Sequence, residues 1–150
     1  MPVPSTIHAQ ELGRIATETY INQTFRVALV DAPGSSFGAD DAFSTIMANE
    51  VTLGFGGYSR QQIGFTSADL GVYEDGTRAL ARKAATFEHN GDLNEVIRFS
   101  HVVVLNPAET QPLCVTKLGG RAALSDGQSA IFYFDFTLYG VFVADQGSNS

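Results

Sequence analysis

Several residue types that mark common functional classes are scarce in this sequence of 150 residues. Tryptophan is absent, cysteine occurs once, and 9 Lys and Arg stand against 16 Asp and Glu, for a formal net charge of −7. Nucleic-acid-binding surfaces need a basic patch because counterion release supplies most of their affinity. The basic residues here are scattered and never run beyond the pair Arg82 and Lys83. We therefore expect no nucleic-acid partner.

The single cysteine excludes an intrachain disulfide. Cys114 lies in the apolar run LCV at residues 113–115, which favours a small core residue over a catalytic thiol. No apolar run approaches the roughly 20 residues that span a bilayer. The N-terminal MPVP does not have the basic region and long apolar stretch of a signal peptide. We expect assembly in a cytoplasm and no membrane partner.

The composition is low in charge for a soluble chain. Charged residues make up 17% of the sequence and hydrophobic residues 44%, whereas about 25% charged is usual in soluble domains. Such a surface favours extensive contact with other protein, and a polar, uncharged β surface is the alternative. The length is typical of one domain with a core of its own.

Alternating apolar residues and turn residues predict a mostly β chain. About seven or eight short strands, with turns between them, predict an antiparallel β-sandwich or jelly-roll-like domain. Gly119-Gly120 predicts a turn, and the SDGQ sequence at residues 125–128 predicts a hairpin. The clearest strand patterns are residues 24–30, 97–105, 113–118 and 130–138, with weaker ones at 51–53, 58–65 and 121–124.

Helical spacing and two ambiguous segments complete the expected organisation. Thr6 to Tyr20 has apolar residues at helical spacing and predicts an N-terminal helix. Asp40 to Asn49 fits a short helix or an irregular connection, and Thr77 to Phe87, after a turn at Asp75-Gly76, fits either helix or strand. We expect one domain, with an N-terminal arm or helix over residues 1–22, the β-sandwich over 23–143 and a flexible tail over 144–150.

One literal catalytic motif is present. Residues 34–38 (GSSFG) match the G-x-S-x-G turn that exposes a nucleophilic serine in α/β-hydrolases, here Ser36. Asp75 or Asp92 and His101 are the acid and histidine that follow it in the chain. The parallel sheet that builds this turn is not predicted, so we interpret the motif as a loop and expect no enzyme. A serine hydrolase using Ser36 is kept as a third hypothesis.

Metal-ligand patterns are also missing. His8, His89 and His101 are dispersed, without the close pairs typical of metal sites. Asp40 and Asp41, together with Glu50, do not follow the spacing of a calcium loop and are interpreted as a solvated acidic loop. We expect no metal, no other cofactor and no catalytic residue.

Residues 56–65 (GGYSRQQIGF) resemble the G-G-Y-x-R-Q strand entry of a family of small tailed-phage virion structural proteins. The order of the surrounding features is similar as well, from a helix and a strand at 25–30, through NEV at 49–51 and a strand at 102–105, to a DGQ hairpin at 126–128. The resemblance covers roughly residues 11–140. Proteins of this family are capsid cement or decoration proteins, or parts of tails and fibres.

The resemblance implies a capsid cement or decoration protein on the capsid surface of the virion. It would bind the major capsid protein of the outer head shell, as a homo-oligomer, and stabilise the shell through protein–protein contacts. The alternative is a tail, baseplate or fibre structural protein involved in host recognition. Candidate interface residues are Phe55, Tyr58, Arg60 and Gln61, because aromatic residues and Arg are favoured at interfaces. Equally open is an intramolecular role, with Tyr58 in the core and Arg60 and Gln61 bonded to a loop.

Overall fold

The computed structural model describes residues 20–38, 40–73, 78–80, 82–136 and 142–146. They form a mostly β fold in which all named strand pairs are antiparallel. Within these ranges, helical structure is limited to α2 (Phe43–Met47) and two 3-10 turns, η1 (Phe55–Gly57) and η2 (Ser67–Asp69), and no helix is long and apolar enough to cross a membrane. The strands are β1 (Thr24–Val30), β2 (Gln61–Gly64), β3 (Leu70–Tyr73), β4 (Arg78–Leu80), β5 (Lys83–Glu88), β6 (Ile97–Leu105), β7 (Pro112–Leu124), β8 (Ser129–Phe136) and β9 (Phe142–Gln146).

The largest sheet has four strands in the order β2-β1-β6-β7. Its two central strands are the two segments with the strongest apolar patterns, and both are almost fully buried. Alternation along β1 divides its side chains between two cores: Phe25, Val27 and Leu29 lie in one, and Ala28 and Val30 lie in the other. The strands predicted over residues 24–30 and 97–105 are therefore confirmed.

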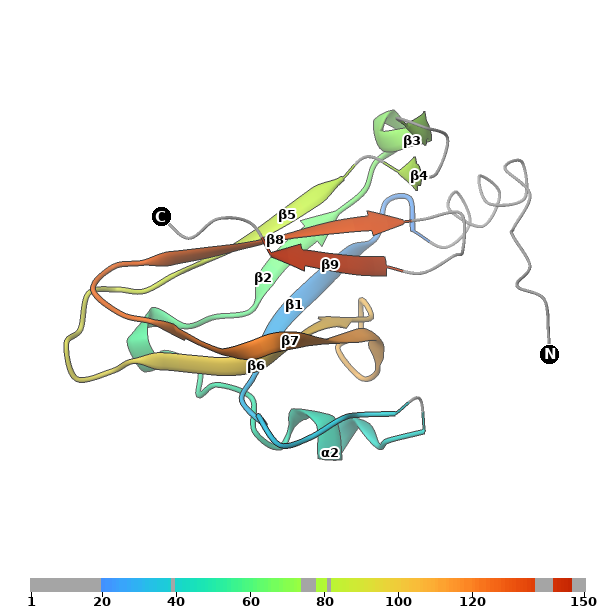
Figure 1. The fold of residues 1–150 in the computed structure, drawn as a ribbon. Helices are drawn as coiled ribbons and strands as arrows, with labels where there is room; N and C mark the ends of the chain where they lie inside the picture. Colours follow the sequence, from blue (N-terminus) through green and yellow to red (C-terminus); the bar gives the residue numbers. More distant parts are fainter. Residues whose placement is uncertain (1–19, 39, 74–77, 81, 137–141, 147–150) are drawn as a thin grey trace.

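A three-stranded sheet in the order β5-β8-β9 lies over the four-stranded sheet (Figure 1). Aromatic side chains of both sheets meet between them. Phe99 of β6 and Phe132 of β8 are both fully buried, and their rings meet edge-on with centroids 5.9 Å apart. Each fully buried side chain of this size contributes about 1.5–3 kcal/mol, so this aromatic core holds the two sheets together. The strands β3 and β4 form a separate two-stranded sheet.

The opposite face of the four-stranded sheet has a smaller core. Ile46 of α2 is buried there against Val30, Val103 and Leu105. Figure 1 shows α2 below the sheet, on the side away from the three-stranded sheet. Of the two alternatives for residues 40–49, the structure thus contains the short helix.

The segment over residues 77–87, left open between helix and strand, is extended wherever it is described. It contains β4 and β5, and β5 pairs with β8 along its whole length. Ala85 and Phe87 point into the core between exposed neighbours, which is the alternation of a strand with one buried face. Residues 125–128 form a tight turn, in which the Gln128 amide donates to the Ser125 carbonyl and Asp126 and Gly127 have positive φ (53° and 76°). The hairpin predicted there is wrong, because β7 and β8 lie in different sheets and do not pair with each other.

The turn predicted at Gly119-Gly120 is wrong, because both glycines lie inside the single 13-residue strand β7. Phe99 pairs with Ala122, whereas His101 pairs with Lys117. Over this interval β7 has three residues more than β6, and the two glycines lie in the resulting bulge. Glycine suits a bulge because its backbone adopts conformations that other residues resist.

The remaining expectations concern the two ends of the chain. Except for Tyr20, which lies in a turn, the helix predicted over Thr6 to Tyr20 falls outside the described residues, as does the Asp75-Gly76 turn. The flexible tail predicted from residue 144 begins inside β9, where residues 144–146 pair with β8. These three residues are part of the sheet, and residues 147–150 lie outside the described ranges.

Candidate functional site

The G-x-S-x-G motif is a loop between β1 and α2. The hydroxyl of Ser36 is exposed and accepts a hydrogen bond from Lys117 Nζ at 3.3 Å. His101 is buried in β6, where its Nδ1 lies 2.7 Å from Ser100 Oγ, and burial and Lys117 together lower its pKa. Asp92 accepts a hydrogen bond from the amide of Asn94 in another loop. The loop packs on His101, since the Phe37 ring lies 5.0 Å from the imidazole between centroids, but no hydrogen bond joins Ser36 to His101 among the described residues. Asp92 lies in the β5–β6 connection, and Asp75 lies outside the described residues.

Side chains that commonly bind metals are separated. Among the described residues, no group of three or more His, Cys, Asp or Glu could hold a metal ion. The His89 ring contacts the carbonyl of Glu95 and accepts a hydrogen bond from the Gly91 amide. These contacts stabilise the β5–β6 connection. Cys114 is half-buried against the aromatic core, and burial raises the pKa of its thiol to about 11. The thiol is therefore protonated at neutral pH and packs as an apolar group.

The best-formed polar arrangement is the Glu50 cluster, which we define as Glu50, Tyr58, Arg60 and Glu109. Tyr58 donates a hydrogen bond to Glu50 Oε2 at 2.7 Å. Arg60 donates to both Glu50 oxygens, from Nε at 2.8 Å and from Nη2 at 2.7 Å, and reaches Glu109 Oε1 at 3.0 Å. These bonds fasten the segment after α2 to the entry of β2 and to the β6–β7 connection. The earlier interpretation of Glu50 as a solvated acid is wrong, because its carboxylate is held by three donors.

Tyr58 also completes the hydrogen bonding of β1. Its hydroxyl accepts a bond from the buried amide of Leu29 at 3.0 Å, beyond the point where β2 stops pairing with β1. Its ring stacks on Phe87 in the core. Burial and the adjacent carboxylate of Glu50 raise the Tyr58 pKa, and the same carboxylate raises the Arg60 pKa. Tyrosine is therefore neutral and arginine charged at all ordinary pH values.

The four predicted interface residues thus have known positions within the fold. Tyr58 is buried, and Arg60 is bonded to two carboxylates, as the intramolecular alternative requires. Gln61 donates to the carbonyl and hydroxyl of Ser59 at the start of β2. Phe55 is half-buried at the edge of the aromatic core. Their contact with a partner stays a prediction.

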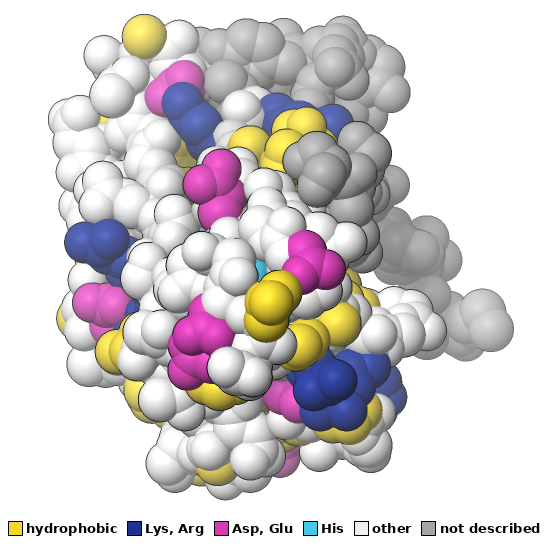
Figure 2. Space-filling view, turned by 90° about the vertical axis from the view of Figure 1, so that its left-hand side faces the viewer, with side chains coloured by type: hydrophobic (Ala, Val, Ile, Leu, Met, Phe, Trp, Pro, Cys, Tyr) yellow, Lys and Arg dark blue, Asp and Glu magenta, His cyan; other side chains and the backbone are white. Residues whose placement is uncertain are grey.

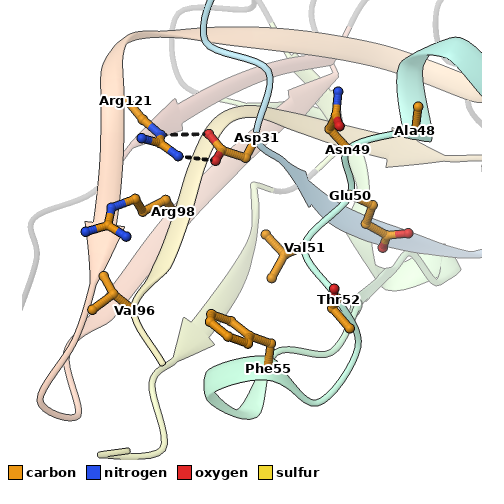
Figure 3. Close-up of a pocket in the computed structure, with 10 residues that line it drawn as sticks. All are labelled: Asp31, Ala48, Asn49, Glu50, Val51, Thr52, Phe55, Val96, Arg98 and Arg121. Carbon is orange, nitrogen blue, oxygen red and sulfur yellow. Dashed lines mark hydrogen bonds and ion pairs between the residues drawn. The ribbon is translucent and has the colours of Figure 1, made fainter. Parts of the chain in front are cut away.

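A hollow of about 470 Å³ opens beside Phe55, where β1 ends before its neighbour β6. We call it the β1 gap. Val51 and Phe55 point into it from one side, and Val96 and Arg98 stand on the other (Figure 3). Its lining also includes Asp31, Ala48, Asn49, Glu50, Thr52 and Arg121.

The cations around the β1 gap differ in their partners. Arg121 of β7 forms a bidentate ion pair with Asp31 at the end of β1 (Figure 3). The Arg121 Nε atom lies 2.9 Å from Asp31 Oδ1. This pair holds the end of β1 against β7 and raises the pKa of Arg121. Arg98 is exposed and has no hydrogen-bond or ion-pair partner among the described residues. The rim of the gap thus presents one guanidinium that can bind an anion.

Two exposed leucines project from the turns next to this gap. Leu53 is 65% exposed and lies between lining residues Thr52 and Phe55, while Leu93 is 78% exposed on the β5–β6 connection that leads to Val96. The same connection packs on η1, since a Cβ at Gly57 would stand 2.9 Å from Asn90 Cβ. Figure 2 views this end of the molecule, where hydrophobic, acidic and basic side chains are interspersed in a surface that is mainly uncharged. The leucines and the gap therefore form one candidate contact surface.

Sequence reasoning missed Arg98, Val96 and both leucines. Arg98 is the one charged residue among Lys, Arg, Asp and Glu in the IRFSHVVVL strand, and this was the available signal for an exposed position. The leucines lie in glycine- and asparagine-containing turns, where an apolar side chain is out of place. The gap has no sequence signal, because it depends on the relative lengths of β1 and β6.

The chain is thus a mostly β, antiparallel protein with a candidate contact surface at one end. No protein-family model, no curated protein and no solved structure matches it.

Proposed function

We propose that this protein is a structural component of a bacteriophage virion, a capsid cement or decoration protein that binds the outer head shell. The observation that carries the proposal is the clustering of Leu53, Leu93 and the β1 gap at one end of a surface low in charge. Exposed apolar groups beside a pocket mark sites of contact with other proteins. The resemblance of residues 56–65 to virion structural proteins supplies the kind of partner.

The architecture supports a binding role. The conspicuous polar side chains, those of the Glu50 cluster and the Asp31–Arg121 pair, bond to one another and fix the segments around the gap. We propose that the two facing sheets are a β-sandwich of jelly-roll-like form, a rigid scaffold for contact loops. Binding would need no cofactor, and the bound protein would be a symmetric oligomer across joints between shell subunits.

The location of the protein in the virion is tested on purified particles of the phage that encodes it. Quantitative mass spectrometry should give a copy number comparable to that of the major capsid protein, and particle imaging should place the chain on the head. Heads assembled without it should break at lower temperature, because binding stabilises the shell by mass action. A few copies per particle, or density only at the tail, would contradict the proposal.

Leu53 and Leu93 test whether this end of the molecule contacts the shell. The double variant Leu53→Ser with Leu93→Ser should bind emptied head shells about tenfold or more weakly, since burial of each leucine contributes about 1.5–3 kcal/mol. Leu113→Ser is the matched control, because Leu113 is an exposed leucine (39%) at the start of β7, outside the gap lining. Equal binding by the double variant and the control would remove this end from the interface.

The alternative proposal is a tail, baseplate or fibre protein that recognises the host surface. A recess between loops, such as the β1 gap, is also what a receptor-binding protein would use. This alternative predicts low copy number, tail location and binding to host cells that the Arg98→Ala change weakens. The particle experiments therefore separate the two functions.

A further inference from the structure

The β1 gap is the position of a missing strand. The pairing of β1 with β6 ends at Val30 and His101, but β6 begins four residues earlier at Ile97. On its other side, β6 remains paired with β7 down to Ile97. Among the described residues, no strand pairs with Ile97 to Ser100 on the side that β1 has left.

The opposite wall of the gap is the segment that follows α2. The amide of Asp31 donates to the Asn49 carbonyl, and that of Val51 to the Leu29 carbonyl, so residues 49–51 run along the edge of β1 that faces away from β6. These bonds already join the segment to β1, and the side chains of Val51 and Phe55 face Val96 and Arg98 across the gap (Figure 3). A strand added to the open edge of β6 would lie about 4.8 Å from it, the normal spacing within a sheet.

The side chains around the gap specify the occupant's chemistry. Ile97 and Phe99 are buried and face the core, and Val51 and Phe55 pack at the edge of the same core. Arg98, between Ile97 and Phe99, faces the other way and is exposed. Residues opposite each other on neighbouring strands project from the same face. An added strand would thus place apolar side chains toward the core and one side chain beside Arg98.

We propose that an extended segment of a partner protein enters the β1 gap as a short β-strand, with an acidic side chain opposite Arg98 and an apolar residue on each side of it. Strand addition to an open sheet edge is a known mode of peptide recognition, in which backbone bonds give affinity and alternate side chains give specificity. An acidic residue is specified because Arg98 has no described partner, whereas Arg121 is engaged by Asp31. The proposal rests on the proposed function only for the source of the segment, a shell subunit.

The proposal is tested first without any shell. Two capped peptides, Thr-Val-Glu-Val-Thr and Thr-Val-Lys-Val-Thr, are titrated into the isotope-labelled protein while backbone amides are followed by NMR. The glutamate peptide should shift the amides of residues 49–52 and 97–99, and should bind about tenfold more tightly than the lysine peptide. Equal binding of the two peptides, or shifts that avoid these amides, would overturn the proposal.

Charge reversal gives the control. Arg98→Glu should invert the preference, so that the lysine peptide binds more tightly. Arg26→Glu makes the same charge change on β1 outside the gap lining, at an arginine that also has no described partner, and should leave the preference for glutamate unchanged. A general effect of net charge would change the peptide preference of both variants in the same way, and that result would refute the specific pairing with Arg98.

A third measurement separates this inference from the proposed function. Hydrogen exchange of the protein bound to emptied head shells should show new protection at residues 97–99. Binding to shells without that protection would keep the proposed function and overturn strand addition by the shell. Peptide binding in the gap without any binding to shells would keep strand addition and refute the cement role.

Discussion

The hydroxyl of Tyr58 makes two bonds that the fold needs, and its removal is the sharpest test of the structure. The change Tyr58→Phe keeps the ring that stacks on Phe87 but deletes the donor to Glu50 and the acceptor for the Leu29 amide. No water can replace the lost partner easily, because Tyr58 is 3% exposed and Leu29 fully buried. The variant therefore leaves a buried amide without an acceptor.

The expected cost follows from those two bonds. An unsatisfied buried amide costs about 1–3 kcal/mol, and a hydrogen bond to a charged group contributes about 1.5–3 kcal/mol. Glu50 keeps both of its bonds from Arg60, so only part of the second amount is lost. We expect Tyr58→Phe to lower the free energy of unfolding by about 2–4 kcal/mol.

Urea denaturation followed by circular dichroism measures this cost. At a slope of about 1–3 kcal/mol per molar urea, the midpoint should fall by about 1–2 M, with the slope unchanged. Tyr133→Phe is the control, because the Tyr133 hydroxyl has no hydrogen bond within the described residues, and its loss should cost under about 0.5 kcal/mol. If both variants cost the same, or the slope changes, the role assigned to the Tyr58 hydroxyl is wrong.

Two further predictions concern a glycine and the cysteine. Gly56→Ala should destabilise by about 2–4 kcal/mol, since Gly56 has φ +59° and a Cβ there would lie 2.7 Å from Ile97 Cγ1. Gly54→Ala is the control, because Gly54 has φ +90° but no atom within 4 Å of an added Cβ, so the variant has only the backbone strain. If the two variants lose the same stability in thermal melts, the packing argument is refuted. Cys114 should be alkylated by iodoacetamide with a rate that rises toward pH 11 in the folded protein. Burial raises its pKa from 9.0 to about 11, so the stability that comes from the neutral thiol is present below pH 9.0 and is lost as pH rises through about 11. Half-maximal alkylation near pH 9 in the folded protein, as in the urea-unfolded chain, would contradict this.

The strands that could be predicted are those whose signal is local. Residues 24–30 and 97–105 alternate or run apolar over their whole length, and the aspartate and glycine of the SDGQ turn adopt positive φ directly. Residues 77–87 stayed ambiguous because alanine, lysine and arginine favour helix in isolation. Pairing with β8 overrides that preference, as it buries Ala85 and Phe87 in the aromatic core.

The candidate surface was only partly predictable. The resemblance drew attention to residues 56–65, which follow Phe55 of the gap lining, but Tyr58 and Arg60 there bond within the fold. The partner of Tyr58 is 29 residues away along the chain, and the residue bonded to the Ala32 amide is 68 away. No local pattern encodes such distant pairs.

The sequence by itself determined a mostly β chain with turns and two central apolar strands, because alternation and turn chemistry act between near neighbours. Only the tertiary structure decided that Gly119 and Gly120 continue a strand through a bulge, since β6 pairs with β7 on both sides of them. It also decided that β1 stops short of β6 and leaves the gap beside Arg98. A missing neighbour is a property of how strands are arranged, so it exists only once the sheet has formed.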